Sequence, residues 1–285
     1  MRYDIHRVRS SLADAQELLA VEARTLADSG YTPQEVVGIL ASPMQRAYLA
    51  LKMEEGEAGG GRAIGFCSCL VTAWRSGLQL EVDMLGVVPE YRGRGIARAL
   101  VARALAEARA DGLHQARAVA AEGNGASARV FRHLGFHAHP GLKDRACDLL
   151  RYEIRGASAV SGLPIGWRGE YLEEGEYPLP IGVLAACGRN HLLWLLWDER
   201  DTLQAAAETQ EVQTLAYRGA WIEAFWAATP LALRALGRLL VERGKVKGWD
   251  EVGYLAPPLA DEARLALVRE GFGHVGRYRY WRRAL

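Results

Sequence analysis

The sequence has little of several features that would assign it to a specialised class. Its charge is almost balanced, with 35 Lys and Arg against 34 Asp and Glu in 285 residues, so it lacks the basic surface typical of nucleic-acid binding. Its longest apolar stretches, Leu179–Cys187 and Leu192–Trp197, are too short to cross a bilayer. The first ten residues contain no apolar core of a signal peptide. We therefore expect a cytoplasmic protein with no nucleic-acid or membrane partner.

Cysteine is also scarce, which argues against a disulfide framework. The four cysteines are irregularly spaced, at Cys67, Cys69, Cys147 and Cys187. Cys67 and Cys69 lie in an apolar run, and a metal or redox role would need a second ligand pair that the sequence does not offer at a suitable spacing. We interpret them as small apolar residues that fill the core.

Three histidines, His133, His137 and His139, have a spacing that could suggest zinc. A helix-to-strand break expected at Gly135 separates the first from the other two, and no cysteine or carboxylate stands at a useful distance. We predict no metal site. His137 or His139 could instead line a substrate cleft.

The length and the pattern of elements indicate two α/β (α+β) domains. In the first part, short alternating strands give way to a helix expected over 96–110, followed by further strand and helix patterns up to Ile154. Gly156–Pro164 has the composition of a linker. We predict domains at 1–155 and 167–285, joined by a linker at 156–166, each with a mixed, mostly antiparallel sheet flanked by helices.

The second part repeats the first at an offset of about 136 residues. Arg98-Ala99-Leu100 falls on Arg234-Ala235-Leu236, Gly112 falls on Gly248, and Gly135-Phe136 falls on Gly271-Phe272. The matched segments share helix and strand patterns in the same order. We interpret the repeat as a tandem duplication.

The segment Val87–Ala97, VVPEYRGRGIA, carries the clearest chemical signal. A strand ends at a proline, a turn with two glycines follows, and a long helix begins. The first turn of a helix has unpaired N–H groups and partial positive charge, and glycines let this backbone approach a phosphate closely. Arg92 and Arg94 add full positive charges. The pattern fits neither a Walker A loop, because Gly-Lys-Ser/Thr is missing, nor a dinucleotide fingerprint, because position 98 is Arg98.

Two motifs in order resemble the GNAT superfamily of acyl-CoA-dependent N-acyltransferases. Arg92-x-x-Gly95-x-Ala97 is similar to the R/Q-x-x-G-x-G/A loop that holds the pyrophosphate of coenzyme A. Asn124 leads through Phe131 to Gly135-Phe136 in a segment similar to the second hallmark of the family. The resemblance covers about Tyr3–Ile154 and implies acyl transfer, most simply of an acetyl group from acetyl-CoA, to a small-molecule or peptide amine.

The resemblance also implies roles for individual residues. The strand before the loop would splay from its neighbour, so that Leu85 and Val87 could pair with the pantetheine arm and the Leu85 N–H could stabilise an oxyanion. The remaining cofactor-binding residues would be Arg92, Gly93, Arg94, Gly95, Ile96, Ala97, Asn124 and Phe131.

The attacking amine must be neutral, and a lysine-like amine has a pKa of about 10.4, so a base or a water relay is needed at neutral pH. Glu81 and Asp83 lie four and two residues before Leu85, respectively, on one face of the strand. Glu81 matches the place of a catalytic glutamate in some family members. Either carboxylate could be the base, or both could be solvated strand residues.

One departure from the family concerns Phe131, which stands where many members carry a tyrosine that protonates the leaving thiolate. A thiol pKa of roughly 8.5 would let the thiolate leave unassisted. A non-catalytic protein that binds or senses acyl-CoA is an alternative, as is a partner-docking role. The sequence leaves open whether the chain is a monomer or a homodimer.

The second part is expected to keep the fold and lose the cofactor site. Arg92, Gly93 and Gly95 fall on Ala228, Thr229 and Leu231, and Asn124 falls on Ala260. Its tryptophans are expected to pack against the first part or to form a wall of the acceptor pocket. The composition favours a helix at Thr202–Gln210 and a strand at Ala220–Ala227.

Overall fold

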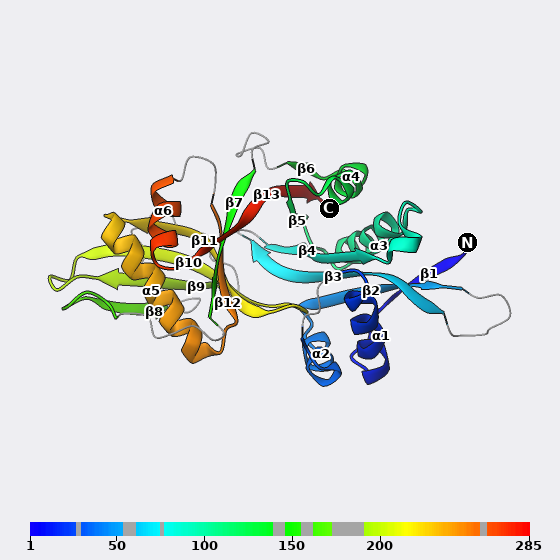
Figure 1. Cartoon of the computed structure of the whole chain (residues 1–285), viewed down its shortest axis with the longest axis horizontal. Helices are drawn as coiled ribbons and strands as arrows, with labels where there is room; N and C mark the ends of the chain where they lie inside the picture. Colours follow the sequence, from blue (N-terminus) through cyan, green and yellow to red (C-terminus); the bar gives the residue numbers. More distant parts are fainter. Residues whose placement is uncertain are drawn as a thin grey trace.

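A computed structural model describes residues 1–26, 30–53, 61–74, 77–138, 146–154, 162–172, 191–256 and 261–285. The strands in these ranges form one thirteen-stranded mixed sheet in which most neighbours are antiparallel. Figure 1 shows helices packed against it at both ends of the molecule. The predicted α/β class is confirmed. We call residues 1–154 the first half and residues 162–285 the second half.

The first half begins with a strand and two helices. Strands follow along the chain, and two further helices stand among them. Its elements are β1 (Tyr3–Arg7), α1 (Leu12–Ala23), α2 (Pro33–Leu40), β2 (Gln45–Lys52), β3 (Arg62–Trp74), β4 (Gly77–Val87), the 3₁₀ turn η1 (Pro89–Tyr91), α3 (Ile96–Ala110), β5 (Gln115–Ala121), α4 (Gly125–His133), β6 (His137–Ala138) and β7 (Cys147–Glu153).

The second half repeats the later part of this order with fewer helices among its described residues. Its elements are β8 (Arg168–Leu172), β9 (His191–Trp197), β10 (Leu203–Gln213), β11 (Arg218–Ala227), α5 (Pro230–Lys247), β12 (Glu251–Ala256), α6 (Asp261–Arg269) and β13 (Gly273–Ala284).

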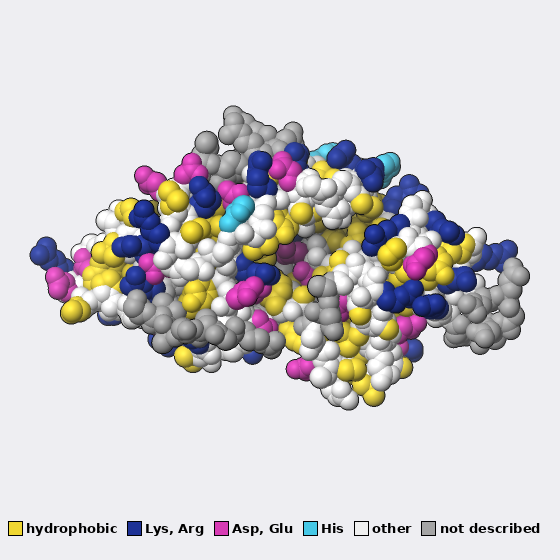
Figure 2. Space-filling model, viewed as in Figure 1, with side chains coloured by type: hydrophobic (Ala, Val, Ile, Leu, Met, Phe, Trp, Pro, Cys, Tyr) yellow, Lys and Arg dark blue, Asp and Glu magenta, His cyan; other side chains and the backbone are white. Residues whose placement is uncertain are grey.

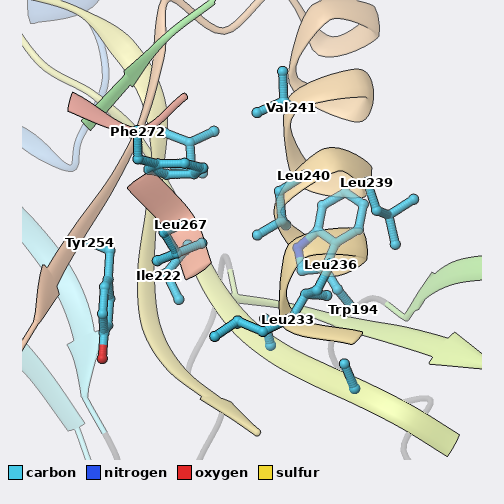
Figure 3. Packing of buried hydrophobic residues seen from close by; sticks show 14 of the residues in the cluster. Trp194, Ile222, Leu233, Leu236, Leu239, Leu240, Val241, Tyr254, Leu267 and Phe272 are labelled. Atoms are coloured by element: carbon cyan, nitrogen blue, oxygen red, sulfur yellow. The ribbon is translucent and has the colours of Figure 1, made fainter. Parts of the chain in front are cut away.

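Each half has its own hydrophobic core. Side chains along a strand point alternately to the two faces of the sheet, so helices can cover a core on either face. In the first half α1 and α2 cover one face and α3 and α4 cover the other (Figure 1). In the second half, leucines of α5 pack over Trp194 while Leu267 and Phe272 pack beside them (Figure 3). Trp249 belongs to this core, whereas Trp281 packs into the core of the first half. Trp281 therefore packs against the first half, which is one of the two roles predicted for the tryptophans, while Trp194 and Trp249 belong to the second half's own core.

Local sequence signals account for several helix ends. Ser11 caps α1 by accepting a hydrogen bond from the Asp14 N–H, and Thr32 and Glu35 form a capping box at the start of α2. Helix α3 has the predicted bounds at both ends. These ends follow from local chemistry that neighbouring residues supply.

The helix expected at Thr202–Gln210 is wrong, because all of this segment after Thr202 belongs to β10. Its alanines and its glutamate and glutamines favour helix in isolation. However, β10 pairs with β9 on one side and β11 on the other, and Ala205, Ala206 and Ala207 are all fully buried. A central strand covered on both faces gains more from this burial than from its helical preference.

The two halves exchange their last strands. β13 pairs with β5 of the first half through Tyr278–Ala284, and β7 pairs with β12 of the second half through Asp148–Glu153. The C-terminus consequently lies beside α4 in Figure 1. The sheet thus runs across the predicted boundary between domains, and residues 156–161 of the predicted linker lie outside the described residues. The limits of the two domains stay a prediction.

The β10–β11 hairpin docks its tip in the first half. Thr214 closes the turn, since its hydroxyl accepts hydrogen bonds from the N–H groups of Ala216 and Tyr217. Leu215 projects from this turn and is buried in the hydrophobic cluster that α1 and α2 form over the first half's strands. Gln213 reaches the Tyr31 hydroxyl at 3.3 Å. The turn therefore joins the two halves apart from the strand exchange.

Replacing Leu215 by alanine is expected to lower the free energy of unfolding by about 2–5 kcal/mol, because a buried leucine is removed from a packed junction. Chemical denaturation of the wild type and the variant measures this. Val246→Ala on α5 is the control, since Val246 is 80% exposed. Equal effects of the two substitutions would show that the hairpin tip is not anchored.

Candidate active site

The loop between β4 and α3 has the geometry of an anion cradle. Gly93 and Gly95 have φ angles of +74° and +79°, in the left-handed region that glycine adopts without strain. Gly95 is the N-cap of α3 and provides no side-chain cap, so the N–H groups of Ile96, Ala97 and Arg98 have no partner among the described residues. A Cβ added at either glycine would meet nothing within 4 Å. The helix end therefore opens onto free space.

The two arginines of the loop, Arg92 and Arg94, make different contacts. Arg94 lies over the Tyr91 ring, 5.8 Å from its centroid. Arg92 donates from Nε to the Val87 carbonyl at 2.9 Å. This carbonyl was one of the groups expected to pair with the pantetheine arm. In the structure it already accepts this one hydrogen bond, and the second lone pair of the carbonyl oxygen can still accept another.

The corresponding helix end in the second half is closed. Thr229 caps α5 by accepting a hydrogen bond from the Ala232 N–H at 3.1 Å, and Pro230 occupies the first helical position. A proline has no N–H group, and the Thr229 hydroxyl accepts a hydrogen bond from one of the other N–H groups in the first turn. This end of the second half lacks the cradle that the first half has.

The C-terminal part of strand β4 splays away from β5, as the resemblance implied. Parallel pairing of the two strands covers Gln79–Val82 and ends there. The register against β3 shifts at the same place, because Ser68 faces Met84 while Cys69 faces Val82. Asp83 is thus the extra residue of a β-bulge, a feature that redirects a side chain. Leu85 and Val87 lie on the splayed segment beyond it.

A cavity of about 780 Å³ lies beside this splay and is lined by both halves. The second half contributes residues of β11 and β12, whose own parallel pairing ends at Ile222 and Tyr254. Two splayed strand pairs therefore border one cavity. Figure 2 shows the hollow between the halves, with acidic side chains visible inside it.

Arg117 of β5 is the central charged residue of this cavity. Its Nε donates to Glu81 at 2.6 Å, and its Nη2 donates to Glu223 of the second half at 3.1 Å. Nη1 donates to the Tyr280 hydroxyl at 2.9 Å. The guanidinium is almost fully buried, which disfavours its charge, but Glu223 and Glu81 more than compensate and raise the pKa of Arg117 above its usual value. Arg117 thereby links the two halves.

Replacing Arg117 by methionine is expected to lower the free energy of unfolding by about 3–5 kcal/mol, because two buried carboxylates lose their common partner. Urea denaturation at neutral pH measures this. The matched control is Arg103→Met, which breaks an exposed pair with Glu107 on α3 and should have a much smaller effect. If both variants lost the same stability, Arg117 would not be a structural link.

The Glu81 carboxylate pairs with Arg117, whereas the Asp83 carboxylate has an oxygen without a hydrogen-bond partner. Burial raises the pKa of Glu81, and the neighbouring Arg117 opposes the rise. The Asp83 Oδ2 atom is buried without a hydrogen-bond partner. Burial, and then the nearby Glu81, Glu251 and Glu22 carboxylates, raise the pKa of Asp83 to about 7. Of the two predicted bases, Asp83 is the one available to accept a proton near neutral pH.

The second half adds titratable groups to the same cavity. The Tyr217 hydroxyl accepts a hydrogen bond from the Trp221 indole N–H. Burial, followed by the Asp83 and Glu251 carboxylates, raises the pKa of Tyr217 well above its usual value. Glu251 pairs with Arg151 at 3.3 Å, yet burial raises its pKa to about 7.

Three predicted cofactor residues have structural roles here. Asn124 is the N-cap of α4, and its Oδ1 accepts a hydrogen bond from the Ser127 N–H at 3.0 Å. Phe131 is 3% exposed and packs against Phe136 and Trp281, so little of its ring is accessible to a cofactor. Ile96 is likewise buried in the core.

The cysteines and histidines give no metal site in the part of the chain that the structure describes. Cys67 and Cys69 are buried side by side, with 3.6 Å between their sulfur atoms, as expected of core residues. His133 contacts the Arg129 carbonyl from an exposed position, and His137 lies in β6. His139 and Cys187 lie outside the described residues.

Sequence reasoning missed Arg117, Tyr217, Glu223 and Glu251. One signal was present, because Arg117 is a single charged residue within the otherwise small and apolar strand QARAVAA. A buried arginine of this kind requires carboxylate partners. The partners themselves lie far away in the sequence, and only the folded arrangement brings them together.

Comparison with known proteins agrees with this geometry. The structure combines one sheet that runs through both halves, a splayed strand pair in each half and an open glycine loop in the first half. Residues 26–136 match the sequence model of the acetyltransferase (GNAT) family. No curated protein sequence matches the chain.

Solved structures extend the likeness over the whole chain. A tandem GNAT protein from the clavulanic acid biosynthesis pathway is 15% identical, with a TM-score of 0.59, covering 99% of this chain and 98% of that one. A GCN5-related N-acetyltransferase from Sphaerobacter thermophilus is 16% identical, with a TM-score of 0.60, covering 98% and 95%. At these identities the likeness shows the fold, which is that of a tandem GNAT protein. No helix in the described ranges is long and apolar enough to cross a membrane.

Proposed function

We propose that the chain transfers an acetyl group from acetyl-CoA to a primary amine. One observation carries the proposal. Strand β4 leads at its end into the uncapped N-terminus of α3, and in its middle it carries Asp83, a carboxylate with an unpartnered buried oxygen that borders a cavity. A site for an anionic cofactor and a base for an amine thus lie on one strand.

The residues of the loop fit the pyrophosphate of coenzyme A. The N–H groups of Ile96, Ala97 and Arg98 have no partner among the described residues, and the space over Gly93 and Gly95 is open. Anions bind at such helix ends because the N–H groups and the helix dipole both favour negative charge. Arg92 and Arg94 would add charge on either side. The thioester, when bound, supplies the acyl group.

The chain's own residues would prepare the acceptor. Asp83 accepts a proton from the ammonium group, directly or through a water molecule, which leaves a neutral nucleophile. A base with a pKa near the working pH is suited to this role. We assign to the Leu85 N–H, two residues farther along the splayed strand, the stabilisation of negative charge on the acyl oxygen. With Phe131 in the core, the departing thiolate is not protonated from that position.

Amine-dependent release of free thiol from acetyl-CoA tests the proposal. The purified chain is incubated with acetyl-CoA and each of a panel of primary amines, and free thiol is recorded. Release that depends on both the amine and the enzyme supports acyl transfer. Saturable binding of acetyl-CoA without release with any amine would support the acyl-CoA-sensing alternative instead. The cytoplasmic location and the monomeric or dimeric state stay predictions.

A further inference from the structure

The cavity beside Asp83 has a wall built entirely by the second half. Tyr217 comes from the docked hairpin tip, Trp221 from β11, and Glu251 and Tyr254 from β12. The Trp221 ring lies against Gly253, where an added Cβ would approach the ring to 3.2 Å. The Trp221 indole is also held by its hydrogen bond to Tyr217. These contacts make a fixed aromatic wall.

The volume and the lining indicate a small organic ligand. About 780 Å³ lies within the range of roughly 300–1,000 Å³ that small-molecule sites occupy. The rings of Tyr217, Trp221 and Tyr254 provide apolar surface and faces that attract a cation. A ligand bound there would have an apolar body that packs on these rings.

The cavity is lined by more carboxyl groups than guanidinium groups. Four carboxylates line it, from Glu81, Asp83, Glu223 and Glu251, against three guanidiniums, from Arg117, Arg151 and Arg282. Arg117 is shared between Glu81 and Glu223, and Arg151 pairs with Glu251. Arg282 lies over the Tyr280 ring, 5.2 Å from its centroid. This pairing leaves the buried Oδ2 of Asp83 without a donor, and an ammonium group would supply one.

We infer that the acceptor is a small, positively charged amine with an apolar body, and that the second half selects it. The ammonium group is directed to Asp83, and the apolar body lies on the wall of Tyr217, Trp221 and Tyr254. Glu251 adds a second carboxylate near the ammonium group. The second half thus determines which amine reaches the site of the first half. This inference rests on the proposed function, because it names the substrate class of the same site.

Isothermal titration without acetyl-CoA tests the inference, using pairs of probes that share a body and differ in charge. The pairs are 2-phenylethylamine and 2-phenylethanol, tryptamine and tryptophol, and hexylamine and hexanol. We expect at least one amine to bind at least tenfold more tightly than its alcohol. Binding of the alcohols as tightly as the amines, or of no amine at all, would overturn the inference.

Amino-acid substitutions test whether the amines bind in this cavity. Glu251→Gln and Trp221→Leu are each expected to weaken amine binding at least fivefold. Glu153→Gln is the control, since Glu153 contacts the same Arg151 from an exposed position outside the cavity lining and should change nothing. Equal effects of Glu251→Gln and Glu153→Gln would contradict the assignment to the cavity. If acetyl-CoA binds normally while every amine fails, only the inference falls, whereas loss of acetyl-CoA binding removes the proposed function.

Discussion

Replacing Gly95 by tryptophan is expected to reduce the affinity for acetyl-CoA by at least 100-fold, about 2.7 kcal/mol. The tryptophan side chain would fill the open space over the loop, and a non-glycine residue is strained at its φ of +79°. Isothermal titration of acetyl-CoA into the wild type and the variant measures the change.

The control for this variant is Gly112→Trp, at the other end of the same helix. Gly112 has a φ of +76°, is exposed, and also has nothing within 4 Å of an added Cβ. The two variants therefore impose similar strain and add the same bulk, but only one changes the loop. Equal losses of affinity would mean that strain in α3, and not the loop itself, governs binding.

Replacing Asp83 by asparagine is expected to lower kcat by about 10²–10⁴-fold, the usual contribution of a general base. Because the base must be ionised and the pKa of Asp83 is about 7, wild-type activity should rise with pH through this value. The rise should be absent from the residual activity of the variant. Steady-state rates between pH 5.5 and 9 measure both effects. A variant with normal kcat would exclude Asp83 as the base.

The same substitution should stabilise the fold at high pH, which separates loss of chemistry from loss of structure. Burial raises the pKa of Asp83 from 3.8 to about 7, so the folded state holds this proton more tightly than the unfolded state. The stability that the protonated group contributes is complete below about pH 4 and is lost as pH rises to about 7. Asparagine never ionises. We expect Asp83→Asn to have a higher Tm than the wild type at pH 8 and a similar Tm near pH 4.

The sequence predicted the parts of the site that depend on neighbouring residues. The bounds of α3 and the glycine turn before it follow from a proline, two glycines and a helical pattern within Pro89–Ala110. The capping box at Thr32 is equally local. Such features depend on backbone chemistry within a few residues, so they can be predicted without knowledge of the rest of the fold.

The choice between Glu81 and Asp83 could not be made in this way. Both stand on one predicted strand, and what separates them is the bulge at Asp83 and the ion pair of Glu81 with Arg117. The strand exchange and the docking of Leu215 depend likewise on contacts between residues far apart in the chain. In β10 a local preference for helix was overridden by pairing with two neighbouring strands.

The central claim is that the first half holds acyl-CoA at the N-terminus of α3 and that the equivalent end of α5 does not. Hydrogen exchange with and without saturating acetyl-CoA tests this on both ends in one sample. The account predicts slower exchange of the N–H groups of Gly93–Arg98 when acetyl-CoA is present, and no change at 228–233. Protection at the start of α5, or none at the start of α3, would contradict it.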